Sequence, residues 1–270
     1  MPLESQIFEK PRLFFTQLLE REGARAARAG KAALDFVLPP RCASCGALTE
    51  RQVGLCAQCW PDLTFITQPF CDRCGTPFEF DIPGTSLCAA CLRRPPAYDK
   101  AFSPLVYEAM ARSLILQFKH GDRLGHARLL GTLMAGQIMQ FGLENPLIVP
   151  IPLHRRRLMR RRFNQSALLA RVISKQIEAQ LDLFTLVRVR ATPMQQGLNS
   201  NQRRENVRAA FGLRRGREGF VKGRNIILVD DVLTTGATAE ACCKPLRKAG
   251  AARICVLTAA RVAGPQTAII

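Results

Sequence analysis

The sequence contains few aromatic residues suited to stacking on nucleic acid bases, and few acidic residues relative to basic ones. It has one Trp and two Tyr, although 15 Phe are present, and 21 Asp and Glu stand against 39 Lys and Arg. The net charge of +18 predicts a polyanionic partner: the phosphates of a small substrate, a nucleic acid, or both. The scarcity of Trp and Tyr disfavours base stacking as the main mode of nucleic acid binding.

Several longer patterns are also missing. No run of about 18 apolar residues occurs, so no membrane span is expected. The first residues lack the basic, apolar and small-residue sections of a secretory signal peptide. Neither Gly-x-Gly-x-x-Gly nor a Walker A string occurs, which argues against a dinucleotide enzyme or a P-loop NTPase. We therefore expect a cytoplasmic protein whose paired cysteines bind metal and do not form disulfides.

Four Cys-x-x-Cys pairs lie between residues 42 and 91. Two thiolates at this spacing bind one tetrahedral ion from a tight turn, and a second pair completes a four-cysteine site. With four sulfurs and no open position, such sites are structural, and we predict two zinc ribbons. Pairing in sequence order is the simplest assignment, but a crossed pairing fits the spacing as well. The predicted ligands are Cys42, Cys45, Cys56 and Cys59 in one ribbon and Cys71, Cys74, Cys88 and Cys91 in the other.

The most informative motif is the stretch 225–238, Asn-Ile-Ile-Leu-Val-Asp-Asp-Val-Leu-Thr-Thr-Gly-Ala-Thr. Its apolar run predicts a strand buried on both faces, which ends at Asp230 and Asp231. A helix over about 239–248 and a strand over 254–257 would complete a β-α-β unit. Ligands in open α/β sheets bind beyond the carboxyl ends of the strands, which is where the two aspartates are expected.

The turn after the aspartates has the residue types of a phosphate site. Thr234, Thr235 and Thr238 bring hydroxyls, and Gly236 allows close approach of the backbone. The following helix N-terminus favours an anion through its free N–H groups and dipole. Two carboxylates would repel a phosphate, so they are expected to face sugar hydroxyls or a hydrated Mg²⁺. The predicted ligand is a phosphorylated sugar.

A second basic motif follows a short predicted strand at 147–149. Six arginines occur within the eight positions 155–162, before a helix predicted over about 167–181. Arginine suits bidentate phosphate contacts, so we interpret this loop as an anion site for pyrophosphate, with Arg155 and Arg161 as candidate ligands. A solvated basic face and a nucleic acid patch are the alternatives. The breaker-rich segment 188–198 is expected to form a mobile loop over the site.

These motifs predict three parts. Residues 1–41 form an amphipathic helical arm, either packed on the protein or in contact with an acidic surface. Residues 42–94 form the double zinc-ribbon module, and residues 95–270 form an α/β domain with a parallel sheet flanked by helices.

The stretch 225–238 resembles the phosphoribosyl-pyrophosphate (PRPP) motif of type I phosphoribosyltransferases. By this resemblance, Asp230 and Asp231 hold the ribose hydroxyls, with Mg²⁺ accompanying PRPP. The 5′-phosphate lies on the turn formed by Thr234, Thr235, Gly236, Ala237 and Thr238.

The order of motifs along about 34–262 is similar to that of the ComF family, bacterial competence-associated proteins with a phosphoribosyltransferase-like domain. The resemblance rests on the cysteine pairs, Phe118-Lys119-His120-Gly121, Val149-Pro150-Ile151-Pro152-Leu153, Phe163-Asn164-Gln165-Ser166, Thr192-x-x-Gln195-x-x-Leu198, Asn206-Val207 and Val229-Asp230-Asp231-Val232-Leu233-Thr234-Thr235-Gly236. It implies a type I phosphoribosyltransferase fold behind a zinc module, and a role in handling incoming single-stranded DNA. Two departures stand out: Arg162 replaces the usual glycine before Phe163, and Pro245 falls inside a predicted helix.

Two functions remain open from the sequence. One is transfer of phosphoribosyl from PRPP to an acceptor, with catalysis by charge stabilisation. The other is a non-catalytic zinc protein that binds single-stranded DNA and bridges to other competence proteins.

Overall fold

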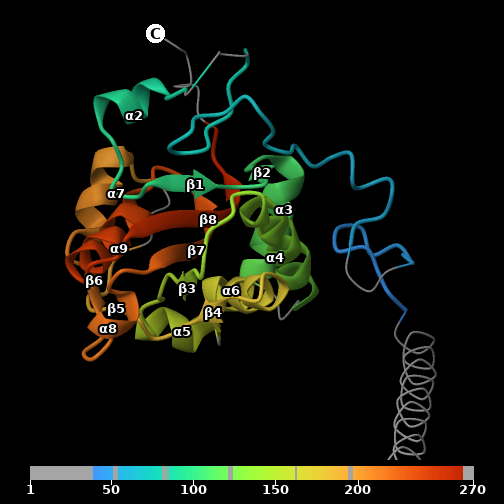
Figure 1. The fold of residues 1–270 in the computed structure, drawn as a ribbon. Helices are drawn as coiled ribbons and strands as arrows, with labels where there is room; N and C mark the ends of the chain where they lie inside the picture. The colour runs from blue at the N-terminus through green and yellow to red at the C-terminus, as the bar shows by residue number, and fades with distance from the viewer. Residues whose placement is uncertain are drawn as a thin grey trace, which may run out of the picture. The chain divides into compact units, whose positions relative to one another are not determined.

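The computed structural model describes residues 39–50, 54–80, 84, 86–120, 124–161, 163–193 and 197–263 (Figure 1). The predicted N-terminal arm lies outside these residues except for 39–41, as do Arg162 and Gln195. The chain divides into two compact units, 1–56 and 57–270.

Within the described residues of the second unit, six parallel strands form one sheet. The strand order is β1-β8-β7-β3-β4, with β2 also paired to β8. The strands are β1 (Lys100–Phe102), β2 (Leu105–Val106), β3 (Leu147–Pro150), β4 (Gln180–Leu181), β7 (Asn225–Leu233) and β8 (Arg253–Arg261). Strand β3 and the apolar run Ile226–Val229 of β7 are buried because helices cover both faces, as expected for a parallel sheet.

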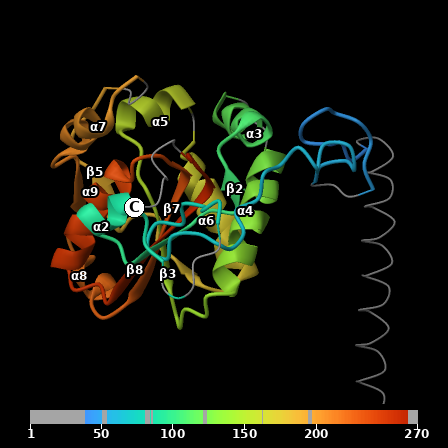
Figure 2. The same ribbon diagram turned by 90° about the horizontal axis from the view of Figure 1, so that it is seen from above.

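Helices cover the two faces in two groups (Figure 2). Helices α3 (Ala109–His120), α4 (Leu124–Met139) and α6 (Gln165–Gln176) lie on one face, where α4 contacts β8 and α6 contacts β3 and β7. On the other face, α9 (Ala237–Lys248) packs its buried side chains against Ile226 and Leu228 of β7. Helix α7 (Ser200–Val207) and strand β6 (Phe211–Leu213) contact α9, and β6 pairs in antiparallel fashion with β5 (Leu186–Arg188). The short helices are α2 (Ala89–Arg93), α5 (Arg155–Arg161) and α8 (Glu218–Val221).

The predicted α/β class is confirmed, and several element boundaries are corrected. Strand β7 does not end before Asp230 but continues to Leu233, because β8 extends alongside it and pairs Asp230 with Thr258. Helix α9 begins two residues earlier than predicted. The arginine run after β3 is not a loop but helix α5, since arginine is a good helix former.

Pro245 lies inside α9, as the sequence suggested. The helix continues only three residues further, to Lys248, so the proline removes one hydrogen bond close to the helix end. Gly250 follows with a φ of +83°, the left-handed conformation that glycine adopts readily after a helix. The predicted helix and its glycine stop are therefore both present.

Candidate functional site at the β3–β7 switch point

Strands β3 and β7 are neighbours, but the chain leaves them toward opposite faces of the sheet. After β3 it passes through α6 and returns in β4, whereas after β7 it passes through α9 and returns in β8. The two connections therefore separate beyond the carboxyl ends of these strands. Ligands of open α/β proteins bind at such a position.

Both predicted aspartates lie just beyond the point where the β3–β7 pairing ends. The pairing of β3 with β7 ends at Pro150 and Val229, so Asp230 and Asp231 extend one and two residues past the end of β3. Ser166, in the first turn of α6, donates its hydroxyl hydrogen to Asp230 Oδ1 at 2.9 Å. This hydrogen bond fixes Asp230 of β7 to the N-terminal end of α6.

Asn164 fixes the N-terminal end of α6 in turn. Its side-chain oxygen accepts from the Ser166 N–H at 3.2 Å, which caps the helix. Its amide group donates to the Ile151 carbonyl at 3.1 Å, just past β3. In the sequence, Asn164 and Ser166 stand out only as part of a motif, and the structure shows why both residue types are needed there.

Lys119, which was not among the predicted site residues, pairs with the second aspartate. Its Nζ lies 3.0 Å from Asp231 Oδ2. The lysine comes from the last turn of α3, more than 100 positions earlier in the chain. Its place in Phe118-Lys119-His120-Gly121 was the only sequence signal, and that signal carried no distance information.

Burial and neighbouring charges shift the pKa values of Asp230 and Lys119. Burial, followed by the charge of Asp231, raises the pKa of Asp230 to about 7, against the lowering effect of the Ser166 hydrogen bond and of Lys119. Burial by itself would lower the pKa of Lys119, but the charge and hydrogen bond of Asp231 outweigh it and the pKa of Lys119 is raised. Lys119 is therefore held in its charged form beside Asp231, and the pKa of Asp230 lies near neutral pH.

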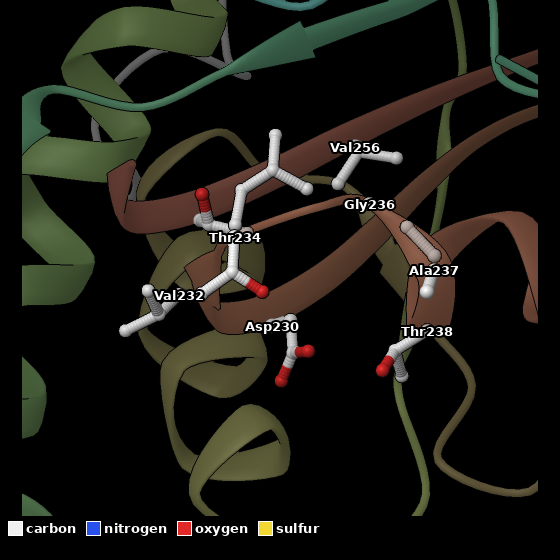
Figure 3. Close-up of a pocket in the computed structure, with 10 residues that line it drawn as sticks. Asp230, Val232, Thr234, Gly236, Ala237, Thr238 and Val256 are labelled. Carbon is white, nitrogen blue, oxygen red and sulfur yellow. The ribbon is translucent and has the colours of Figure 1, made fainter. Parts of the chain in front are cut away.

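A pocket lies between Asp230 and the turn before α9 (Figure 3). Gly236 is the N-cap of α9 and has a φ of +77°, a conformation that glycine adopts without the strain a side chain would add. Among the residues that the structure describes, none hydrogen-bonds to the buried hydroxyl of Thr235. The predicted residues Asp230, Thr234, Gly236, Ala237 and Thr238 line the pocket together with Thr258.

Both predicted arginines belong to α5, the short helix between β3 and α6. Arg161 donates to Gln165 Oε1 at 3.4 Å and so contacts the first residue of α6. Arg155 is exposed at the start of α5. Arg161 is thus linked to the helix that holds Asp230, whereas Arg155 faces solvent.

The eight predicted cysteine ligands form two groups, and the sequential pairing is confirmed over the crossed one. In each group the sulfurs lie within 4.8 Å of one another, as required for one tetrahedral ion. Backbone N–H groups point at the first sulfur of each set, from Cys56 to Cys42 and from Cys88 to Cys71, both at 3.3 Å. Four thiolates with supporting N–H donors fit structural Zn²⁺, so the chain carries two structural zinc sites.

Comparison with known proteins agrees with both parts. Residues 33–92 match the family described as Double zinc ribbon domain, and residues 163–268 match the Phosphoribosyl transferase domain. None of the helices in the described ranges combines the length and apolar character needed to cross a membrane.

Curated relatives cover most of the chain. DNA utilization protein YhgH of Escherichia coli (strain K12) is 34% identical over 74% of this chain and 87% of its own. Competence protein F of Haemophilus influenzae is 32% identical over 82% of this chain and 96% of its own. Competence protein ComFC of Bacillus subtilis (strain 168) is 26% identical over 73% of this chain and 80% of its own. The chain therefore belongs to the ComF family, in which a double zinc ribbon is joined to a phosphoribosyltransferase-type α/β domain.

Proposed function

We propose that this protein binds PRPP, or another phosphoribosyl compound, together with Mg²⁺ where β3 and β7 end. The observation that carries the proposal is the arrangement of one acidic and one anion-binding group around a single pocket. Asp230 stands on one side, and the turn that opens the 12-residue helix α9 stands on the other. A ligand with both a phosphate and a diol or metal ion matches this division of charge.

Each part of the ligand then has a partner. The 5′-phosphate lies on the turn 234–238, because the N–H groups and the positive dipole end of α9 favour an anion there. Its ligands are Thr234, Thr235, Gly236, Ala237 and Thr238, and the Thr235 hydroxyl, buried without a partner among the described residues, supports this role. Asp230 and Asp231 hold the ribose hydroxyls or the hydrated Mg²⁺, which prefers carboxylate oxygens.

The pyrophosphate group of PRPP would lie toward the basic helix α5. Arg161 supports this placement because its contact with Gln165 leads to the helix end that holds Asp230. In a transfer reaction, Arg155, Arg161 and Mg²⁺ would stabilise the negative charge of the departing pyrophosphate, so no nucleophilic side chain is required. The chemistry supplied by Mg²⁺ is charge neutralisation on the phosphates.

The names of the relatives suggest the cellular setting. DNA utilization protein YhgH is named for the use of DNA, and Competence protein F is named for competence. We propose that this chain acts in the cytoplasm in the same process, natural DNA uptake, alongside other competence proteins.

The test is calorimetric titration of PRPP with Mg²⁺ into the wild type and into Asp230→Asn/Asp231→Asn. We expect binding to the wild type and at least a ~100-fold weaker affinity for the variant, about 2.7 kcal/mol. Asp62→Asn/Glu218→Gln is the matched control, since it removes two exposed carboxylates and so makes the same charge change. Absence of binding to the wild type would refute the proposal.

A second candidate is binding of single-stranded DNA through phosphates. The net charge of +18 and the exposed Arg155 favour it. It is compatible with the first, because a phosphoribosyl site can accept the end of a nucleotide chain.

A further inference from the structure

The second cysteine cluster belongs to the same hydrophobic core as the turn 234–238. Its four cysteines are buried, with exposures between 0% and 7%. They pack in one cluster with Tyr98, Ala237 and Ala239, the last two being in the first turn of α9. In the first cluster, by contrast, Cys45 is exposed. A change at the second cluster can therefore reach the pocket through packed side chains.

The turn between the first two cysteines of this cluster lies directly on strand β1. The Ala101 N–H donates to the Arg73 carbonyl at 2.9 Å. A Cβ on Gly75, which has a φ of +69°, would lie 2.8 Å from the Ala101 carbonyl oxygen. No side chain fits there, so the metal-binding turn and the sheet edge are in direct backbone contact.

Tyr98 connects the metal-binding turn to the turn 234–238. The Arg73 guanidinium donates to the Tyr98 carbonyl at 3.2 Å. Tyr98 is 3% exposed, and its hydroxyl lies 3.4 Å from the point that a Cβ on residue 236 would occupy. Tyr98 thus fills the space between the cysteine cluster and the left-handed Gly236.

Two polar contacts run beside the tyrosine. Arg94, which follows α2, lies 3.7 Å from Glu240 in the first turn of α9, and the Glu240 N–H donates to the Gly236 carbonyl at 2.8 Å. Arg261, at the end of β8, donates to the Thr76 hydroxyl at 2.7 Å. The Arg94 side chain is 59% exposed, so its ion pair is weak, and the packing of Tyr98 is the main link.

We propose that Zn²⁺ in the second cluster keeps the turn 234–238 in its ligand-binding shape through Tyr98, which acts as a positioning residue. Zinc in the first cluster has no such effect. The consequence for PRPP rests on the proposed function, but the support of the turn by the metal does not. The physical reason is that small zinc ribbons obtain most of their folding free energy from the metal. Loss of zinc would release the four cysteines of the second cluster and remove the support beneath Tyr98.

The experiment compares Cys91→Ser with Cys45→Ser, which removes one ligand from each cluster. Zinc content should fall from two to one per chain in both. Hydrogen exchange of a peptide covering 234–240 should rise about tenfold in Cys91→Ser only, with a β3 peptide as internal reference. Affinity for PRPP with Mg²⁺ should weaken about tenfold in the same variant only. Equal exchange in the two variants would overturn the proposal.

Tyr98→Leu tests the link without touching the metal. This variant should keep two zinc ions per chain and still show faster exchange at 234–240, whereas Tyr98→Phe, which keeps the ring, should exchange like the wild type. If Cys91→Ser unfolds throughout, Tyr98→Leu decides: unchanged exchange at 234–240 would overturn the proposal. If the wild type does not bind PRPP, the proposed function is refuted. The hydrogen-exchange measurements still test whether zinc supports the turn 234–238.

Discussion

The Nζ of Lys119, at the end of α3, and the Oδ2 of Asp231, in β7, form an ion pair at 3.0 Å. The two side chains are 20% and 15% exposed, so water screens the pair only in part. The pair neutralises one of two adjacent carboxylates in the free protein. Lys119 is therefore a protein cation in direct contact with the group that we propose to bind ribose or Mg²⁺.

Replacement of Lys119 by methionine should destabilise the protein by about 1–3 kcal/mol, because Asp231 is left partly buried without its partner. Chemical denaturation at pH 8 measures the effect. Asp231→Asn in the same chain should recover most of the loss, since no unpaired charge remains. Arg208→Met is the control: its pair with Glu205 is about 75% exposed on both sides, and the change should stay within ~0.5 kcal/mol. If Lys119→Met and Lys119→Met/Asp231→Asn lose the same free energy of unfolding, the ion-pair explanation is wrong.

The raised pKa of Asp230 makes stability depend on pH. The pKa rises from 3.8 to about 7, mainly through burial. Between these values the folded protein holds a proton that the unfolded chain has released, so its stability falls as the pH rises. Asp230→Asn should therefore raise the Tm of the ligand-free protein increasingly from pH 5 to pH 8. Asp62→Asn, at an exposed position, should show no such trend, and a constant Tm difference for Asp230→Asn would count against the raised pKa.

Ser166 should set the pH range of ligand binding, because its hydrogen bond lowers the pKa of Asp230. A ligand that needs the ionised carboxylate loses affinity below that pKa, up to about tenfold per pH unit. Ser166→Ala should move the midpoint of Mg²⁺–PRPP binding upward by about 0.5–1 pH unit. Ser174→Ala removes a hydroxyl hydrogen bond to Ala179 beyond the other end of α6 and serves as the control. A midpoint that does not move in Ser166→Ala would exclude Asp230 as the titrating group.

The two zinc ions should leave at different rates. Fresh reduced protein should contain two zinc ions per chain, since each of the two clusters offers four sulfurs. A chelator should remove the first ion faster, because Cys45 is exposed whereas the second cluster is buried. A colorimetric zinc assay over time should show two phases, and only the first should be absent in Cys45→Ser. A single phase in the wild type would contradict this prediction.

Binding of single-stranded DNA should depend on salt. Each contact between a basic side chain and a DNA phosphate releases a bound counterion, and added salt opposes this release. The logarithm of the affinity should therefore fall linearly with the logarithm of salt concentration. Arg155→Ala should reduce the slope by roughly one phosphate contact. PRPP with Mg²⁺ should respond less steeply in the same titration. Salt-independent DNA binding would contradict phosphate recognition by the basic residues.

The sequence determined those features in which the chemistry lies within a short stretch. Cysteine pairs at Cys-x-x-Cys spacing predict metal binding because a tight turn brings their sulfurs together. The stretch 225–238 predicts strand, acidic edge, glycine turn and helix because each step is a local preference. The absence of a long apolar run argued against a membrane span. The absence of nucleotide-binding glycine motifs argued against a dinucleotide enzyme or a P-loop NTPase. These signals identified the α/β class, the eight cysteine ligands, and Asp230, Thr234, Gly236, Ala237 and Thr238 among the residues that line the pocket.

Only the tertiary structure decided which distant residues meet. Spacing allowed sequential and crossed cysteine pairs alike, and the folded turns selected the sequential order. Lys119 and Asp231 are separated by more than 100 positions, and Tyr98 and Gly236 by more again. Such contacts depend on the strand order β1-β8-β7-β3-β4, which places early and late segments side by side. No local preference encodes that order, because it arises from how the whole chain buries its apolar surface.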